Sequence, residues 1–417
     1  MSRGADDAVI ASRQPNWLGS MGVIRRGEAL NFMALISAQV IVALVGLAST
    51  RYLAPSDKGL FTGVYLWSLI GQTIFGLSLP NALLYYGAAE GRGRPTMRVV
   101  YVLGSASLLV GAGLGLFVGV HAPGHLFLQW LLVSLPTAML AFEVATYSAL
   151  SEGGPFYAYR LIQALLFAVV GLPILVFTHS PTLLTAVLLA SYVCSVGVRW
   201  LSPLGSPAKP AALRLGMAQL LRWSWRGHAG LTLSLLATRL DLLFVTLFLT
   251  TFAAGQYAAA AAFPNLLAYS GTALGLSLAR RATAGNDNRT PRFAVRWGFI
   301  LLATSAATAG ILIGLRTPLI TGLFGAPYEP ATAILIPLAV ALPFWSVAAY
   351  ESQVLAAVGR PVHQTIGQGI ASLVLAAGSV YGVVHQDVQV VAWSNVAAYG
   401  CSVVWQSLAL STFRQSR

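Results

Sequence analysis

Apolar stretches long enough to cross a bilayer follow one another along almost the whole chain, with only short polar segments between them. A run of about 20 apolar residues spans the hydrocarbon layer of a membrane as a helix. Only 9% of the residues are charged, whereas a typical soluble domain has about 25%. The sequence therefore predicts an all-α integral membrane protein and leaves no stretch for a soluble catalytic domain.

Twelve segments are predicted to be transmembrane helices, because the bilayer interior offers no partners for backbone groups left outside a helix. The polar stretch 1–28 precedes the first of them. Its Arg25 and Arg26 resemble the start of a signal peptide, but the apolar segment that follows is too long for one, so we expect a retained helix. The predicted spans are 29–50, 61–87, 99–120, 126–149, 157–178, 182–198, 227–249, 256–279, 296–315, 333–356, 363–384 and 389–411.

The distribution of basic residues predicts the orientation of the chain. If the N-terminus is cytoplasmic, 21 of the 25 lysines and arginines fall on the cytoplasmic side. Arg51, Lys58 and Arg316 fall outside, and Arg239 lies within a span. This asymmetry follows the positive-inside rule and predicts that both termini are cytoplasmic. It also accounts for the net charge of +13 without a nucleic-acid partner.

The two halves of the chain resemble each other. Tyr-Val-Cys-Ser-Val at 192–196 returns as Tyr-Gly-Cys-Ser-Val at 399–403, an offset of 207 residues. Gly-Gly-Pro at 153–155 returns as Gly-Arg-Pro at 359–361, an offset of 206, and residues 53–61 have a shorter echo in 252–257, an offset of 196. Each match links one span to the sixth span after it, so the two repeats share one orientation. Transporters built from parallel repeats bind substrate between the halves.

These patterns predict two parallel six-helix repeats around a central cavity. The domains would be a cytoplasmic tail at 1–28, a first lobe at 29–198, a linker at 199–226, a second lobe at 227–411 and a short tail at 412–417. The second part of the linker places its arginines on one side of a helix. This is typical of an amphipathic helix in the cytoplasmic interface, although a simple charged loop is the alternative.

Several segments carry a family resemblance. They are Arg-Tyr-Leu-Ala-Pro at 51–55, Leu-Phe-Gly-Ala-Pro-Tyr-Glu-Pro-Ala at 323–331 and Leu-Ala-Ala-Val-Gly-Arg-Pro at 355–361. With these segments the chain resembles the Wzx-like oligosaccharide and polysaccharide flippases. Those share a superfamily, called MOP, with the MATE exporters and the lipid II flippases.

The resemblance implies a V-shaped bundle of two lobes that translocates polyprenyl-pyrophosphate-linked oligosaccharides to the outer leaflet. It implies a multi-pass protein of the inner (cytoplasmic) membrane. The partners would be membrane lipid, the lipid-linked glycan and other polysaccharide-assembly proteins.

Three acids lie inside the spans, where charge is costly and usually functional. They are Glu143, Asp241 and Glu351. Glu143 and Glu351 occupy near-equivalent positions in two repeat-related spans. These acids are candidates for coupling transport to a proton or Na⁺ gradient. The alternative is that each pairs with an arginine or an amide and fixes helix packing.

Three basic residues are candidates for contact with the substrate. Arg239 and Asp241 are two residues apart, so they point about 200° apart on a helix and cannot pair with each other. A cavity arginine suits a pyrophosphate, and an interhelical salt bridge is the alternative. Arg51 and Lys58 depart from the charge asymmetry. By resemblance to the lipid II flippases, Arg51 would contact an anion, while a salt bridge with Asp57 is the alternative.

Polar side chains within the spans are candidates for hydrogen bonds to sugar hydroxyls, although bonds between helices are the more ordinary role. The candidates are Gln39, Gln72, Asn81, Asn265, Gln353 and Asn395.

Two other functions remain open at this point. A MATE-like cation or drug antiporter needs an acidic cavity. A polyprenyl-dependent glycosyltransferase or polymerase needs a sizeable outer loop with catalytic groups. The longest predicted outer loop spans about 317–332, and its only charges are Arg316 at its start and Glu329 within it. We expect a transporter rather than an enzyme, with no cofactor, no metal centre and no disulfide, since Cys194 and Cys401 both lie in spans.

Overall fold

The structure is a computed structural model, and it describes residues 26–76, 78, 126–151, 156–201, 217–284, 290–358 and 360–415. Within these ranges the chain forms long α-helices joined by short connections, with a π-helical turn at Pro318–Gly322 and a 3-10 turn at Ala326–Tyr328. The described part contains no strand. The helices are α2 (Arg26–Tyr52), α3 (Pro55–Phe75), α6 (Leu126–Ser151), α7 (Phe156–Thr178), α8 (Pro181–Leu201), α9 (Met217–Phe248), α10 (Thr251–Ala284), α11 (Thr290–Gly314), α12 (Ala331–Ala357), α13 (Pro361–Val384) and α14 (Val388–Gln415).

The all-helical fold expected from the sequence is confirmed for the described residues. Each of these helices overlaps one predicted span, while the predicted span 99–120 and the end of 61–87 lie outside the described residues. Seven of the helices are both long and apolar enough to cross a membrane, namely α6, α7, α8, α9, α11, α12 and α13. The full set of twelve spans and the cytoplasmic placement of both termini stay predictions.

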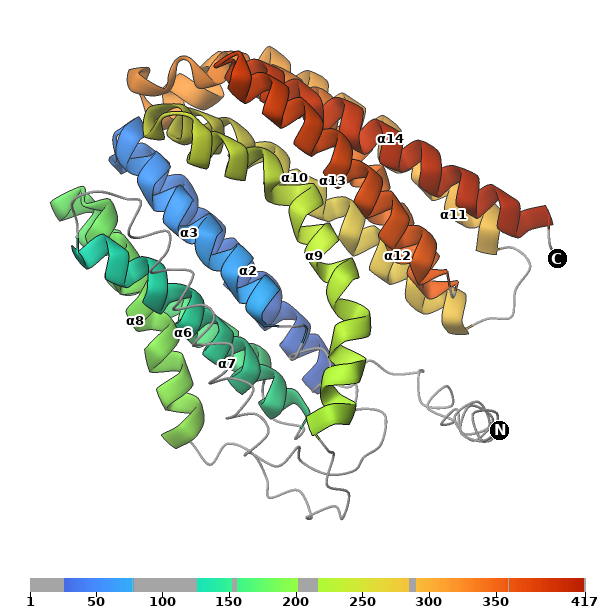
Figure 1. Cartoon of the computed structure of the whole chain (residues 1–417), viewed down its shortest axis with the longest axis horizontal. Coiled ribbons are helices and arrows are strands. Elements are labelled where there is room, and N and C mark those ends of the chain that lie inside the picture. Colours follow the sequence, from blue (N-terminus) through green and yellow to red (C-terminus); the bar gives the residue numbers. More distant parts are fainter. Residues whose placement is uncertain are drawn as a thin grey trace.

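The helices pack in two groups that meet along α3 and α10. In the first group α2 packs on α7, α8 packs on α6 and α7, and α3 packs on α6. In the second group α12 contacts α10, α11 and α14, while α13 contacts α9 and α14. Figure 1 shows the first group in blue and green beside the second in yellow to red, with α3 next to α10. Apolar side chains such as Leu131, Leu184 and Leu335 are fully buried inside these groups.

The helix boundaries repeat at the offsets seen in the sequence. α2 ends at Tyr52 and α9 ends at Phe248, 196 residues later, and α3 and α10 begin at Pro55 and Thr251, again 196 apart. α6 and α12 end at Ser151 and Ala357, an offset of 206, and α8 and α14 begin 207 residues apart. The offsets of the short sequence echoes therefore match the offsets between equivalent helix ends, which supports an internal repeat.

A reciprocal contact joins the two groups at the start of α3 and α10. A Cβ atom added at Gly59 would collide with the carbonyl oxygen of Thr251, and one added at Gly255 would collide with that of Pro55. The same added atoms would lie 3.0 Å from Gly255 N and 3.1 Å from Gly59 N. Each residue of this contact is related to its counterpart by 196 positions, so the two helices cross with local two-fold symmetry. Only glycine allows two backbones to approach this closely.

The connection between the two halves differs from the prediction in one respect. α9 begins at Met217, so Arg222 and Arg226 belong to its first turns and not to a separate amphipathic helix. The polar and apolar residues of this stretch are helical, as expected, but the helix continues directly into the predicted span 227–249. Residues 199–201 of the predicted linker belong to the end of α8, and residues 202–216 lie outside the described residues.

Topology can be tested by cysteine labelling from outside the cell. Ser56 and Pro327 are exposed at the end of the structure where α3 and α10 cross, which the charge asymmetry places outside. Cysteines at these two positions are expected to react with an impermeant maleimide, whereas cysteines at Asn288 and Lys209 are expected to react only after the membrane is permeabilised. Labelling of Asn288 in intact cells would contradict the twelve-span topology.

Candidate functional site

The described part of the second group of helices encloses a cavity with Arg239 in its wall. Two adjoining pockets make up this cavity, with about 380 and 770 Å³ of empty space. They share Thr238, Arg239, Asn265 and Trp345 as lining residues. α9, α10, α12 and α14 contribute to both, and α13 lines only the larger one. Arg239 therefore lies where the two pockets join.

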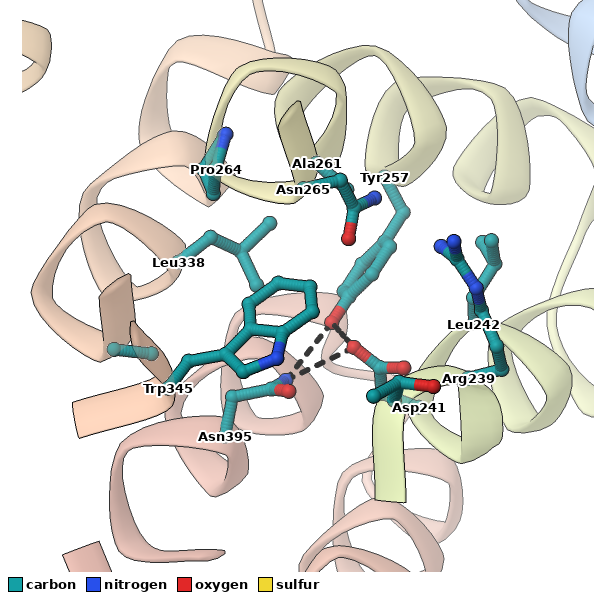
Figure 2. A pocket seen from close by; sticks show the side chains of 12 residues that line it. Arg239, Asp241, Leu242, Tyr257, Ala261, Pro264, Asn265, Leu338, Trp345 and Asn395 are labelled. Carbon is teal, nitrogen blue, oxygen red and sulfur yellow. Dashed lines mark hydrogen bonds between the residues drawn. The ribbon is translucent and has the colours of Figure 1, made fainter. Parts of the chain in front are cut away.

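Arg239 and Asp241 point in different directions from α9, as their spacing predicted. Among the described residues Arg239 makes neither a salt bridge nor a hydrogen bond, so the alternative of an interhelical salt bridge is not seen. Figure 2 shows its guanidinium standing apart from the Asp241 carboxylate. The positive charge of Arg239 is therefore available to a group that enters the cavity.

Asp241 is held in a network that joins three helices. The hydroxyl of Tyr257 on α10 donates to Oδ2 of Asp241, and Nδ2 of Asn395 on α14 donates to the same oxygen at 3.0 Å. Nδ2 of Asn395 also lies 3.1 Å from the Tyr257 hydroxyl, and the dashed lines in Figure 2 trace this triangle. The carboxylate is 7% exposed, and its Oδ1 receives no hydrogen bond within the described residues. The hydrogen bonds from Tyr257 and Asn395 therefore fix the side chain of Asp241 between α9, α10 and α14.

The larger pocket is polar but contains little charge. Carboxamides, hydroxyls and aromatic rings line it, and among the described residues Arg239 is its one charged side chain. Trp345 stacks on Tyr399 with ring centroids 5.2 Å apart and planes 6° apart. The Tyr399 hydroxyl donates to the carbonyl of Ala237 at 2.8 Å, which fixes the pair against α9.

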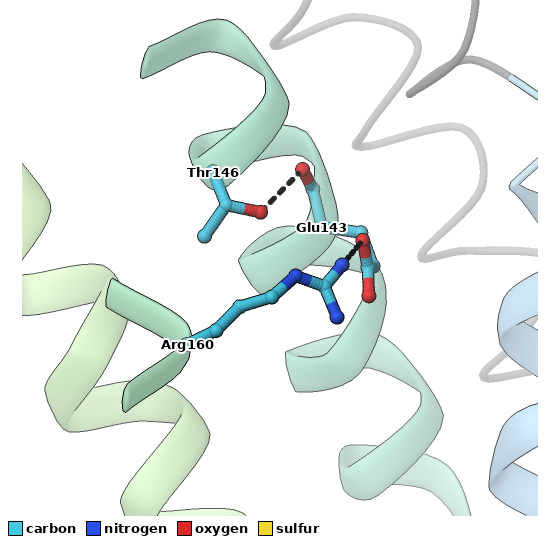
Figure 3. A network of polar contacts seen from close by, with 3 residues as sticks. All are labelled: Glu143, Thr146 and Arg160. Carbon is cyan, nitrogen blue, oxygen red and sulfur yellow. Dashed lines mark hydrogen bonds and ion pairs between the residues drawn. The ribbon is translucent and has the colours of Figure 1, made fainter. Parts of the chain in front are cut away.

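Glu143 forms an ion pair with Arg160, between α6 and α7 (Figure 3). Both side chains are mostly buried, and the Arg160 guanidinium also lies over the ring of Phe142. Glu143 does not line the cavity that contains Arg239. This arrangement corresponds to the packing alternative for Glu143.

Glu351 faces α14 and not the cavity. Its Oε1 accepts a hydrogen bond of 2.7 Å from the Ser407 hydroxyl, and its Oε2 is buried without a partner among the described residues. It does not line either pocket, although its neighbours Ser352 and Gln353 line the larger one. Of the three predicted acids, Asp241 alone lines the described cavity.

Arg51 and Lys58 lie at the end of the structure where α3 and α10 cross, away from the cavity. Arg51 is exposed, and its Nη1 is 3.7 Å from the position of an added Cβ at Gly325. Arg51 makes no salt bridge with Asp57 among the described residues. The structure does not bring Arg51 and Arg239 into one site in this conformation.

Lys58 is buried in the first turn of α3, because this helix begins at Pro55 and not near residue 61 as predicted. Its Nζ donates to Gly46 O at 3.1 Å and to Ser49 Oγ at 2.7 Å, both on α2. In this conformation the ammonium therefore joins α2 to α3, and it is not presented to a ligand.

The same end is closed by contacts of the connection between α11 and α12. The Tyr328 hydroxyl donates to Leu53 O at 3.0 Å, and burial raises the pKa of Tyr328, so the phenol stays a neutral donor. Gln256 on α10 donates to Pro327 O at 2.7 Å and accepts from Ala331 N at 3.1 Å. With the glycine crossing, these contacts close one end of the structure, which we name the closed end.

Several cavity residues were not predicted from the sequence, notably Trp345, Tyr399, Tyr257 and the glutamines of α13. Tyr399 could have been noticed because it begins the repeated motif of 399–403. The motif alone does not predict which way its side chain points. Asn265 and Gln353 were predicted as polar candidates and do line the cavity.

Neither protein-family models nor curated protein sequences give a match to this chain. Solved structures do. The lipid II flippase MurJ in an inward closed conformation superposes with a TM-score of 0.73, at 14% identity over 92% of this chain and 87% of that protein. An inward-facing MATE family multidrug transporter of the MOP superfamily gives a TM-score of 0.65, at 15% identity over 91% and 96%. The Vibrio cholerae MATE transporter VcmN in its bent form gives 0.58, at 14% identity over 92% and 96%.

The chain has the fold of these transporters. The similarity extends over nearly the whole length of each protein, so the helices described above belong to one transporter-like architecture. At this level of identity the fold is shared, while the substrate follows only from the site.

Proposed function

We propose that this protein is a membrane flippase that moves polyprenyl-pyrophosphate-linked oligosaccharide across the inner (cytoplasmic) membrane by alternating access. The observation that carries the proposal is Arg239, a cationic side chain without an ionic partner among the described residues, in the wall of a polar cavity. A guanidinium binds phosphate oxygens through paired hydrogen bonds. The likeness in fold to a lipid II flippase supports the same class of substrate.

The closed end fits one state of such a cycle. With the orientation predicted from the basic residues, the crossing of α3 and α10 closes the outer side of the protein. Substrate would then reach the cavity from the cytoplasmic side, where a lipid-linked glycan is assembled. Arg51 is exposed at the closed end and would meet the diphosphate after the conformational change, so Arg239 and Arg51 would contact the substrate one after the other.

Asp241 is the proposed ion-coupling residue. Asp241 follows Arg239 by two residues on α9, and both side chains line the smaller pocket. A proton or Na⁺ bound at the free Oδ1 of Asp241 would therefore change the charge of the wall that the diphosphate contacts. The MATE-like alternative needs a carboxylate that faces a cationic drug. The larger pocket presents Arg239 and no acid among its described lining residues. The acid of the smaller pocket, Asp241, already accepts hydrogen bonds from Tyr257 and Asn395, which disfavours that alternative.

Substitution of Arg239 tests this proposal. In proteoliposomes, Arg239→Ala is expected to lower translocation of a polyprenyl-diphosphate-linked sugar about 100-fold, because a charge-assisted contact of about 1.5–3 kcal/mol is lost in a low-dielectric cavity. Arg239→Lys is expected to recover only part of this rate, since an ammonium cannot bind two phosphate oxygens in the same plane.

Arg296 provides a matched control, because it is an exposed arginine at the start of the apolar part of α11 and lines neither pocket. Arg296→Ala is expected to leave the rate within about twofold of the unchanged protein, as most surface substitutions do. Normal translocation by a well-expressed Arg239→Ala protein would contradict the proposal.

A further inference from the structure

The larger pocket has the chemistry of a carbohydrate site. Four of its lining side chains are carboxamides and four are serine or threonine hydroxyls, in addition to its aromatic rings. Each carboxamide offers a donor and an acceptor a fixed distance apart, which matches neighbouring hydroxyls on a sugar ring.

Some of these polar side chains are hydrogen-bonded within the protein, and others have no hydrogen-bond partner among the described residues. Nε2 of Gln368 on α13 donates to Ser352 Oγ at 3.0 Å, and Ser352 in turn donates to Gln406 Oε1 at 3.2 Å. By contrast, the side chains of Asn265, Gln353 and Gln364 make no hydrogen bond within the described residues. All three side chains are partly exposed and line the cavity, so their donors and acceptors are available to a ligand with several hydroxyls.

Trp345 supplies a flat surface in the same cavity. Tyr399 covers one face of its ring, and the hydrogen bond from Tyr399 to Ala237 holds the pair in place. Trp345 lines both pockets, and Figure 2 shows it in the smaller one. The face of an aromatic ring carries partial negative charge and attracts weakly positive hydrogens. The C–H groups on one side of a pyranose ring present such hydrogens.

We infer that this pocket of the second half is a saccharide subsite, in which Gln353 and Gln364 bind sugar hydroxyls, Trp345 supports the ring, and Arg239 binds the attached diphosphate. The subsite takes a neutral sugar joined to a diphosphate. That the sugar is linked to a lipid rests on the proposed function, because a nucleotide sugar presents the same sugar and diphosphate groups.

Binding measurements on the detergent-solubilised full chain test the subsite without requiring transport. The probes are short-chain polyprenyl diphosphates that carry either no sugar, one hexose or one N-acetylhexosamine, together with UDP-linked forms of the same sugars. Gln353→Leu and Gln364→Leu remove the hydrogen-bonding atoms and leave an apolar side chain of similar bulk. Gln389→Leu is the matched control, because Gln389 is exposed at the start of α14 and lines neither pocket.

The unchanged protein is expected to bind a sugar-bearing polyprenyl diphosphate more tightly than the sugar-free one. Gln353→Leu and Gln364→Leu are each expected to weaken the sugar-bearing probe about tenfold, the effect of one lost hydrogen bond with a buried group left unpaired. They should leave the sugar-free probe within about twofold, whereas Arg239→Ala weakens both probes. Trp345→Ala should weaken only the sugar-bearing probe, and the Gln389→Leu control should match the unchanged protein.

Two results would overturn the inference. One is equal affinity of the unchanged protein for sugar-bearing and sugar-free diphosphates across the panel. The other is an equal effect of Gln353→Leu and Gln364→Leu on both kinds of probe. If UDP-linked sugars bind as tightly as the polyprenyl-linked sugars, the result would support the subsite and would indicate a soluble nucleotide sugar as its ligand. Sugar-dependent binding without translocation would leave the subsite standing and overturn the proposed flippase function.

Discussion

Gly59→Ala and Gly255→Ala are each expected to lower translocation about tenfold, because an added methyl group in a close backbone crossing costs about 1–3 kcal/mol. At both positions the new Cβ would collide with a main-chain carbonyl oxygen, which cannot move aside as a side chain can. The crossing of α3 and α10 would have to widen, and the closed end would lose stability relative to other states of the cycle.

Gly63→Ala provides a control on the same helix. A Cβ at Gly63 would lie 3.8 Å from the side chain of Thr246, an ordinary contact, so this variant should transport normally. Spin labels at Ser56 and Phe252, which are exposed and related by the repeat, report the width of the crossing. The distance between them is expected to lengthen in Gly59→Ala and not in Gly63→Ala. An unchanged distance together with full transport would show that the crossing is not part of the transport cycle.

Asp241→Asn is expected to abolish the response of transport to an imposed proton or Na⁺ gradient while substrate binding persists. The amide keeps the shape of the side chain and can still accept from Tyr257 and Asn395, but it removes the charge that would hold the ion. Glu143→Gln and Glu351→Gln are the matched comparisons, since neither residue lines the cavity.

Both comparison variants are expected to keep the gradient response. Glu143→Gln should instead lower the yield of folded protein, because it leaves Arg160 without its ionic partner. Transport is measured in proteoliposomes with each gradient imposed separately. A full response in Asp241→Asn would remove Asp241 from the coupling mechanism, and loss of response in Glu351→Gln alone would transfer that role to Glu351.

Much of the fold could be predicted from the sequence because the bilayer requires each span to be apolar over a fixed length. The positions of α6, α7, α12 and α13 followed from this requirement alone, and the offsets of the repeat anticipated equivalent helix ends. The separation of Arg239 from Asp241 was also predictable, since the two residues share one helix and their relative direction depends only on its geometry.

The candidate site was less accessible to sequence reasoning because it depends on how separate helices face one another. Nothing in the sequence gives the rotation of α6 against α7, so the pairing of Glu143 with Arg160 remained one of two alternatives. The burial of Lys58 followed from an earlier start of α3 than hydrophobicity indicated. The stacking of Trp345 on Tyr399 joins α12 and α14, and an aromatic residue in an apolar span carries no local sign of its partner.

Translocation by the purified protein tests the central claim most directly. Proteoliposomes with a fluorescent polyprenyl-diphosphate-linked saccharide in both leaflets would be treated with a membrane-impermeant glycosidase or reductant, and a labelled phospholipid and a cationic dye would serve as parallel substrates. The flippase proposal predicts that the protein makes the inner pool of the glycolipid accessible within minutes, does not scramble the phospholipid, and does not exchange the dye for protons. Gradient-driven movement of the cationic dye without movement of the glycolipid would contradict it and favour the MATE-like alternative.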